Sequence, residues 1–193
     1  MSIHVGVLAL QGAFQKHIDL LQASGVSAVT VRQPDELENC NALIIPGGES
    51  TTISLLMKQY GLYQPIRSFA ENNPVMGVCA GMIMMASDVD DDRVTPLGLI
   101  PFTAKRNHYG RQVHSFSTQL TLDFAVRDKD LPFPAIFIRA PGVENISPEV
   151  EVLAKKDEEA IILRYGKHMA LSFHPELTGD SRIHDFWLAT AMA

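Results

Sequence analysis

The stretch Gly77-Val78-Cys79-Ala80-Gly81 places a cysteine between two glycines, after one apolar segment and before another. A nucleophile on a tight turn between a strand and a helix needs small neighbours on both sides, because the backbone there is cramped. Amide groups at the start of the following helix would favour the reactive thiolate. We therefore interpret Cys79 as a candidate nucleophile, with a buried, inert cysteine as the alternative. Cys40 has no such glycines and is assigned no chemistry.

A nucleophilic cysteine usually needs a base, and His174-Pro175-Glu176 follows a short apolar segment. Residues two apart in an extended chain point to the same side, and Pro175 favours that conformation. Glu176 could then hold one ring nitrogen of His174 and leave the other for Cys79. A structural or metal-binding histidine is the alternative, but no third ligand lies at a suggestive spacing, so no metal is expected. The remaining histidines have no comparable context and are assigned no chemistry: His4, His17, His108, His114, His168 and His184.

A third candidate is the turn Pro46-Gly47-Gly48-Glu49-Ser50. Glycines let the backbone turn freely and leave its amide groups unobstructed. The amides of Gly48 and Ala80 could together hold the oxyanion of a tetrahedral intermediate. The alternative is a phosphate-binding turn or a plain loop, although the Lys-Ser/Thr end of a P-loop is absent.

The elements that position these residues can be read from hydrophobic patterning. Apolar runs at 5–10, 26–31, 42–46 and 75–78 predict strands, and helices are expected between 12 and 25, over 50–60 and over 63–71. Ser50 or Thr51 is expected to cap the second helix. Alternating strands and helices predict a parallel sheet covered on both faces, with ligands beyond the carboxyl ends of its strands. The Gly48 and Cys79 turns should therefore share one edge of the sheet.

The second half of the chain has a different pattern from about Leu97 onward. Strands are expected at 112–124, 135–139, 150–154, 160–165 and 169–173, with a closing helix at 181–191. These strands are expected to extend the sheet with mixed or antiparallel pairs, and the acidic run 88–92 to be a solvated loop. The sequence thus predicts a three-layer α/β fold with a central, mostly parallel sheet, formed by a single domain over 1–193.

Composition narrows the function. The chain has 193 residues, of which 46% are hydrophobic and 20% charged, which argues against disorder. The net charge of -6 argues against nucleic-acid binding, and no apolar run is long enough to cross a bilayer. No basic leader is expected, and the two cysteines suit a reducing compartment. We expect a cytoplasmic protein without a nucleic-acid or membrane partner and without a cofactor.

Taken together and in this order, the three blocks resemble class I, or triad, glutamine amidotransferases, which have a flavodoxin-like α/β fold. Within that family the chain is most similar to the glutaminase subunits of pyridoxal 5'-phosphate synthases, over nearly its whole length. The stretches that carry this similarity are Leu8-Ala9-Leu10-Gln11-Gly12 with His17, Pro46-Gly47-Gly48-Glu49-Ser50-Thr51-Thr52, Cys79-Ala80-Gly81-Met82-Ile83, Arg106-Asn107, Tyr109-Gly110-Arg111-Gln112, Ser115-Phe116 and Phe173-His174-Pro175-Glu176-Leu177-Thr178.

The resemblance implies that Cys79 attacks the side-chain amide of L-glutamine, with His174 and Glu176 completing the relay through a glutamyl thioester. The positions that match the family's glutamine-contacting residues are Gly48, Glu49, Ser50, Arg106, Ile138 and Arg139. Glu49 could pair with the substrate ammonium and an arginine with its carboxylate, but the sequence leaves open which arginine does so.

The resemblance further implies a partner, a (β/α)8-barrel synthase subunit that consumes the ammonia to make pyridoxal 5'-phosphate and activates the glutaminase on docking. Other readings stay open at this point. They are a glutaminase of histidine or purine synthesis, a peptidase, and a non-catalytic protein on a related α/β scaffold that uses Cys79 to sense redox state.

Overall fold

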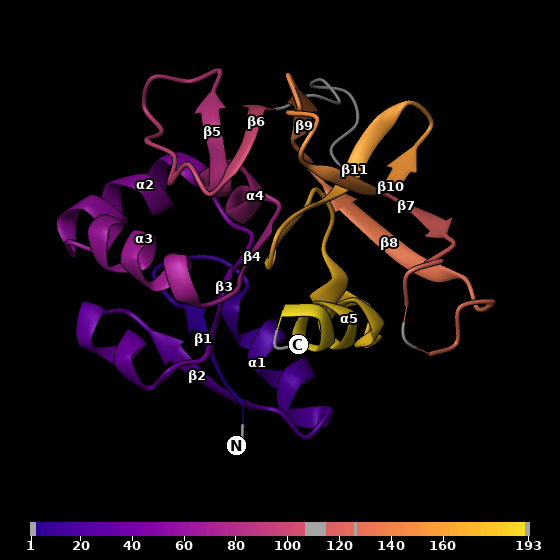
Figure 1. Ribbon diagram of the computed structural model, residues 1–193, viewed down its shortest axis with the longest axis horizontal. Coiled ribbons are helices and arrows are strands. Elements are labelled where there is room, and N and C mark those ends of the chain that lie inside the picture. The colour runs from indigo at the N-terminus through magenta and orange to yellow at the C-terminus, as the bar shows by residue number, and fades with distance from the viewer. Residues whose placement is uncertain (1–2, 107–114, 126, 192–193) are drawn as a thin grey trace.

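The computed structural model describes residues 3–106, 115–125 and 127–191. Its main sheet is built from β1 (His4–Leu8), β2 (Ser27–Val31), β3 (Ala42–Ile45), β4 (Val75–Val78), β10 (Glu151–Lys156), β11 (Glu159–Tyr165) and β12 (His168–Leu171). Within these residues the strands lie in the order β10-β11-β12-β4-β3-β1-β2 (Figure 1). The five from β12 to β2 are parallel, and β11 and β10 add antiparallel pairs at one edge. The predicted central, mostly parallel sheet is confirmed.

Helices cover both faces of this sheet (Figure 1). The helices are α1 (Phe14–Ala23), α2 (Ser50–Gln59), α3 (Tyr63–Asn72), α4 (Ala80–Met85), α5 (Arg182–Ala191) and the 3-10 turns η1 (Pro34–Asn39) and η2 (Pro175–Leu177). Successive side chains of a strand point to opposite faces. In β3, Leu43 belongs to the apolar cluster that includes residues of α2, α3 and α4, while Ile44 belongs to the cluster of α1 and α5. The layers are therefore helix, sheet and helix, as predicted.

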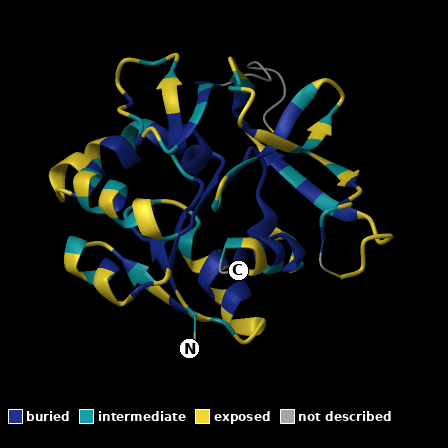
Figure 2. Cartoon of the chain, in the orientation of Figure 1, coloured by how far each residue is buried: buried dark blue, intermediate teal, exposed yellow. Residues whose placement is uncertain are grey.

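Helices α1, α2 and α3 turn their apolar sides toward the sheet and their polar sides toward solvent, which Figure 2 shows as dark and yellow stripes, whereas all residues of α4 are buried. Helix α1 ends at Ala23, and Gly25, at φ +78, lets the chain turn back into β2. In the described parts of the chain, no helix combines the length and apolar character needed to cross a membrane.

Two predicted strands do not extend the main sheet. In the described chain, β7 (Ser115–Leu120) and β8 (Phe133–Ile138) form an antiparallel sheet of their own, so this part of the prediction is wrong, and 112–114 lie outside the described residues. The reason is visible in β8, where buried and half-buried residues alternate, whereas the strands between two helical layers are buried on both faces. The buried face of β8 packs with α5 in one apolar cluster.

The acidic run 88–92 is also not simply a solvated loop. It begins inside β5 (Ala86–Val89), which pairs with β6 (Ile100–Lys105), and β6 pairs with β9 (Gly142–Glu144) in a further small sheet of the described chain. The side chain of Asp91 is only 15% exposed, because it bonds the guanidinium groups of Arg93 and Arg106. Charge-assisted hydrogen bonds from two arginines thus take the place of part of the water around this carboxylate.

Candidate active site

Cys79 occupies the turn between β4, which ends at Val78, and α4, which begins at Ala80. Its backbone angles are φ 53 and ψ -105, a conformation that residues with a side chain rarely adopt. The Cys79 amide donates to the Leu171 carbonyl of β12, with 2.7 Å between nitrogen and oxygen. Strained backbone of this kind persists only where the surroundings hold it, and such sites are often functional.

The two glycines that flank Cys79 each have a steric reason. A Cβ on Gly77 would lie 2.5 Å from the Gly81 carbonyl oxygen and from the Met85 sulfur. A Cβ on Gly81 would lie 1.9 Å from the carbonyl oxygen of Ile45 in β3. The helix that carries the turn can therefore pack this close to the sheet only without these side chains, as the sequence predicts.

His174 and Glu176 lie where the main sheet ends, after β12. Nδ1 of His174 is 2.7 Å from Oε1 of Glu176, so the predicted contact is present. The predicted extended backbone is wrong, because Pro175 begins the 3-10 turn η2, and a proline is favoured at the first position of such a turn. The turn folds Glu176 back onto the ring. The His174 amide donates to the Ile136 carbonyl of β8 at 2.8 Å, which fixes the base against the small sheet.

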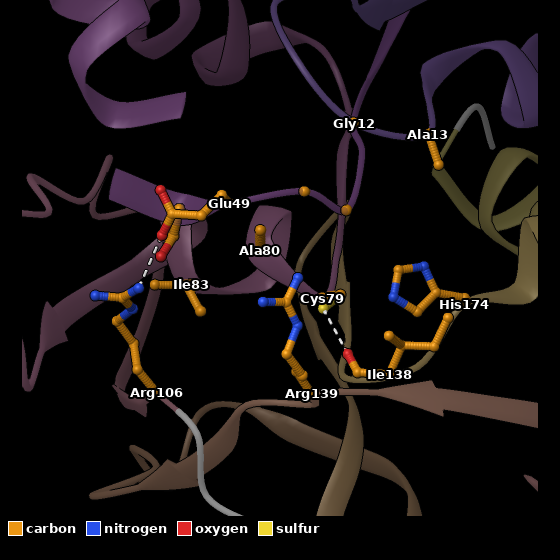
Figure 3. Close-up of a pocket in the computed structure, with 13 residues that line it drawn as sticks. Gly12, Ala13, Glu49, Cys79, Ala80, Ile83, Arg106, Ile138, Arg139 and His174 are labelled. Atoms are coloured by element: carbon orange, nitrogen blue, oxygen red, sulfur yellow. Dashed lines mark hydrogen bonds and ion pairs between the residues drawn. The ribbon is translucent and has the colours of Figure 1, made fainter. Parts of the chain in front are cut away.

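The charges of this pair support each other. Burial opposes protonation of His174, but its hydrogen bonds to Cys79 and Glu176 outweigh that effect and raise its pKa to about 10. Burial likewise opposes ionisation of Glu176, yet the hydrogen bond from His174 and the proximity of His17 hold the pKa of Glu176 below its ordinary value. The arrangement therefore favours an imidazolium beside a carboxylate. In its thiol form Cys79 donates to the Ile138 carbonyl, with Sγ 3.7 Å from the oxygen (Figure 3).

The glycine turn docks on the segment that follows β1. The Gly47 carbonyl accepts from the Ala13 amide at 3.3 Å, and the Glu49 amide donates to the Gln11 side-chain oxygen at 2.8 Å. A Cβ on Gly48 would lie 2.3 Å from that same oxygen, so a larger residue would displace the Gln11 side chain from the Glu49 amide. Sequence reasoning gave Gln11 no role, although the stretch that contains it contributes to the family resemblance.

Glu49 caps helix α2, so the expectation that Ser50 or Thr51 is the cap is wrong. Its carboxylate accepts from the backbone amides and hydroxyls of Thr51 and Thr52. Burial opposes its ionisation, but these hydrogen bonds prevail and lower the pKa of Glu49 to about 2. Glutamate reaches farther than serine, so it can satisfy two amides and still pair with a third group. That group is Arg106, whose Nη2 is 2.9 Å from Oε1 of Glu49.

These groups meet around one pocket of about 200 Å³, a size that suits a small metabolite rather than a large ligand (Figure 3). It is lined by Gly12, Ala13, Gly47, Gly48, Glu49, Ser50, Cys79, Ala80, Ile83, Arg106, Ile138, Arg139 and His174. Every site residue predicted from the sequence is therefore on the pocket wall except Glu176, which lies behind His174. The two arginines differ: Arg106 is paired with Glu49 and Asp91, whereas Arg139 has no carboxylate partner among the described residues.

Comparison with known proteins agrees with this geometry. Residues 7–192 match the SNO glutamine amidotransferase family. The chain belongs to this family. The pyridoxal 5'-phosphate synthase subunit PdxT of Desulforudis audaxviator is 46% identical to it over 96% of this chain and 97% of that protein. PdxT of Herpetosiphon aurantiacus is 48% identical, over 95% and 98% respectively. A solved structure described as a glutamine amidotransferase superposes with a TM-score of 0.90 at 40% identity, over 98% of this chain and 99% of that one.

In this glutamine amidotransferase, two histidines that sequence reasoning left without a role lie behind the candidate triad. Nε2 of His17 is 3.5 Å from Oε2 of Glu176, and Nδ1 of His17 is 3.1 Å from Nε2 of His184. The sequence does indicate that both are buried, because each histidine falls on the apolar face of its helix, beside Ile18 in α1 and Ile183 in α5. A buried polar side chain needs a partner, but the sequence does not say which one.

Proposed function

We propose that this protein hydrolyses L-glutamine to L-glutamate and ammonia and supplies the ammonia to a pyridoxal 5'-phosphate synthase. The observation that carries the proposal is a cysteine on a strained turn that shares a small pocket with a histidine already held by a glutamate. Nδ1 of His174 lies 2.7 Å from Glu176, which leaves Nε2 for Cys79. The relatives that match over nearly their full length carry the name of the corresponding synthase subunit.

The chemistry is acyl transfer in two halves. The Cys79 thiolate attacks the side-chain amide carbon, and the resulting oxyanion is held by the backbone amides of Gly48 and Ala80. The protonated His174 gives its proton to the departing nitrogen, so ammonia leaves and a glutamyl thioester remains. His174 then takes a proton from water, the hydroxide adds to the thioester, and collapse of this intermediate releases glutamate and restores Cys79.

The ends of the substrate are held by the charged wall of the pocket. We assign the substrate carboxylate to Arg139, because Arg106 is already paired with two carboxylates. The ammonium faces Glu49, whose side chain is 36% exposed and stays ionised. Ser50 and Ile138 complete the contact surface beside the nucleophile. Arg139→Lys keeps the charge but loses the two-pronged contact, so it should raise KM for glutamine more than Arg106→Lys does.

Released ammonia is mostly protonated in water at neutral pH and is then a poor nucleophile. A glutaminase of this kind is therefore useful beside an enzyme that consumes ammonia before it escapes. We propose that the partner is a (β/α)8-barrel synthase subunit, that docking activates this subunit, and that the pair works in the cytoplasm. Equal rates of glutamate release with and without the barrel subunit would contradict activation.

The deciding experiment measures glutamate release from L-glutamine by this chain alone and with the barrel subunit. The matched variants are Cys79→Ala and Cys40→Ala, since both cysteines are buried and free but only Cys79 lines the pocket. Glutamate release that rises with the partner, vanishes in Cys79→Ala and persists in Cys40→Ala supports the proposal. Near wild-type activity in Cys79→Ala overturns it. If a glutamine-analogue electrophile also fails to label Cys79 with the partner present, the redox-sensing alternative gains support.

A further inference from the structure

His17 and His184 form a buried chain that ends on the candidate triad. His17 comes from α1 and His184 from α5, 167 residues apart in sequence, and their side chains have almost no exposure to solvent. The two rings are tilted by 56° with their centroids 5.4 Å apart, so the contact is between nitrogens and not a face-to-face stack. Beyond His17 lies Oε2 of Glu176, the carboxylate oxygen that His174 does not use.

The hydrogens on the rings of His17 and His184 can be placed by counting hydrogen-bond donors and acceptors. Burial lowers the pKa of His17 to about 4 despite the nearby Glu176 carboxylate, and burial also holds the pKa of His184 well below its ordinary value. Both rings are therefore neutral at pH 7, and a neutral imidazole has one donor and one acceptor nitrogen. Because an ionised carboxylate only accepts, Nε2 of His17 must carry the hydrogen that faces it. Nδ1 of His17 is then the acceptor, and His184 donates from Nε2.

Two atoms show why this contact matters. In the described chain, Nε2 of His17 and Oε2 of Glu176 are fully buried and neither has a hydrogen-bond partner at standard geometry. They lie 3.5 Å from each other, and a contraction of about 0.3 Å brings an N–H group within bonding range of oxygen. Burying both groups unpaired is costly, whereas pairing them satisfies both at once.

We propose that His17 is a positioning residue of the reaction: it donates from Nε2 to Glu176, and His184 fixes the tautomer of His17. Glu176 then accepts one hydrogen bond at each oxygen, from His17 on one side and from His174 on the other. The carboxylate is held ionised and cannot rotate, so His174 keeps its hydrogen on Nδ1 and presents Nε2 to Cys79. This inference rests on the proposed glutaminase reaction.

The proposal predicts a change in pH dependence. The ionisable groups around Glu176 in the described chain are His17, His174, and beyond these two His184 and Cys79. Without the donor from His17, Glu176 binds a proton at a higher pH, and its protonated form no longer holds His174 in the required tautomer. The acid limb of kcat/KM should therefore move to higher pH, while a merely structural defect would lower the rate without moving the limb.

The test compares His17→Leu, His17→Gln and wild type for glutaminase activity with the barrel subunit present. In His17→Leu we expect kcat to fall about tenfold and the acid limb to move up by about one pH unit, the size expected for one lost hydrogen bond. The side-chain amide nitrogen of His17→Gln reaches the place of Nε2, so both values should return toward wild type. His168→Leu removes a half-buried histidine outside the pocket and serves as control, with the limb unmoved. An unmoved limb in His17→Leu overturns the proposal.

A second measurement needs no variant and no turnover. Nitrogen-15 NMR of the histidine rings in the free chain at pH 7 should show the hydrogen on Nε2 for both His17 and His184, and hydrogens on both ring nitrogens of the protonated His174. A hydrogen on Nδ1 of His17 would reverse the donor and acceptor roles of the two histidines and overturn the proposal, even if His17→Leu fails to fold. If wild type releases no glutamate with the partner bound, the proposed function fails, whereas the ring protons still decide the role of His17.

Discussion

Gly81→Ala distinguishes helix propensity from packing, because the two effects change the free energy of unfolding in opposite directions. Gly81 lies in α4, where alanine is intrinsically favoured over glycine by about 1 kcal/mol. The structure places the new Cβ 1.9 Å from the Ile45 carbonyl oxygen and 2.8 Å from the carbonyl carbon. Real Cβ atoms essentially never approach another atom closer than 3.0 Å, so α4 and the end of β3 must separate by about 1 Å.

The expected cost follows from this displacement. Forcing extra atoms into a packed core typically costs about 1–3 kcal/mol, and a clash with main chain belongs at the upper end of that range because no side chain can rotate away. After subtraction of the propensity gain, we expect a net loss of about 2 kcal/mol. For a chain of this size that corresponds to a fall in Tm of roughly 4–8 °C. A shift of about 1 Å beside Cys79 should also lower kcat by about 100-fold.

Urea and thermal unfolding measure the stability, and glutamate release with the partner measures the rate. Gly25→Ala is the matched control, since Gly25 has φ +78 and no atom within 4 Å of its added Cβ. It should cost about 1–2 kcal/mol through backbone strain alone and leave the rate unchanged. An unfolding midpoint of Gly81→Ala equal to or above that of wild type would refute the reasoning. A rate of glutamate release in Gly81→Ala equal to that of Gly25→Ala would also refute it.

Three further predictions concern charged groups. Glu49→Ala removes the cap of α2 and should lower the free energy of unfolding by about 1 kcal/mol at pH 7, as measured by urea unfolding. Because the pKa of Glu49 is about 2 in the folded protein and its ordinary value is 4.5, this stabilisation should be full above pH 4.5 and lost as pH falls toward 2. A cost that persists at pH 2 would contradict this. His168 accepts a hydrogen bond from the Val75 amide at 3.2 Å, and burial lowers the pKa of His168 to about 4. Its contribution to stability should therefore be lost as pH falls from about 6.5 to 4. A midpoint above pH 6 for the titration of His168, followed by NMR, would exclude this. Asp91→Asn loosens Arg106 and should raise KM for glutamine about threefold to tenfold with little change in kcat, so an altered kcat at constant KM would argue for another role.

The first half of the fold follows from the sequence because its central strands, β3 and β4, are fully buried. The apolar run 75–78 predicts a strand with the bounds that β4 has, and the glycines around Cys79 indicate the turn that follows it. Such runs are hard to misread, since helices on both faces of a parallel sheet leave no place for polar residues. The same logic places the Gly48 and Cys79 turns at one edge, where the structure has them.

The features that the sequence does not reveal depend on distant partners. Within the described residues, the strands at 115–120 and 133–138 pair with each other and not with the main sheet. Their alternation indicates one buried face but not which surface covers it. Asp91 reads as part of an acidic loop until Arg106 is placed beside it. The contact between His17 and His184 joins the first helix to the last, and no local pattern encodes it. In each case the interaction energy belongs to a pair whose members are remote in sequence.

The insertion of β12 between β11 and β4 has a consequence for how the chain is made. Until residues 168–171 leave the ribosome, β4 is the outer strand of a four-stranded parallel sheet, with an apolar and unpaired edge that invites association with other chains. The arrival of β12 covers that edge, bonds the Cys79 amide through Leu171 and brings His174 to the pocket. A nascent or truncated chain that ends before β12 would therefore be both prone to aggregation and chemically inert. Cys79 is joined by His174 only when β12 has paired with the exposed edge of β4.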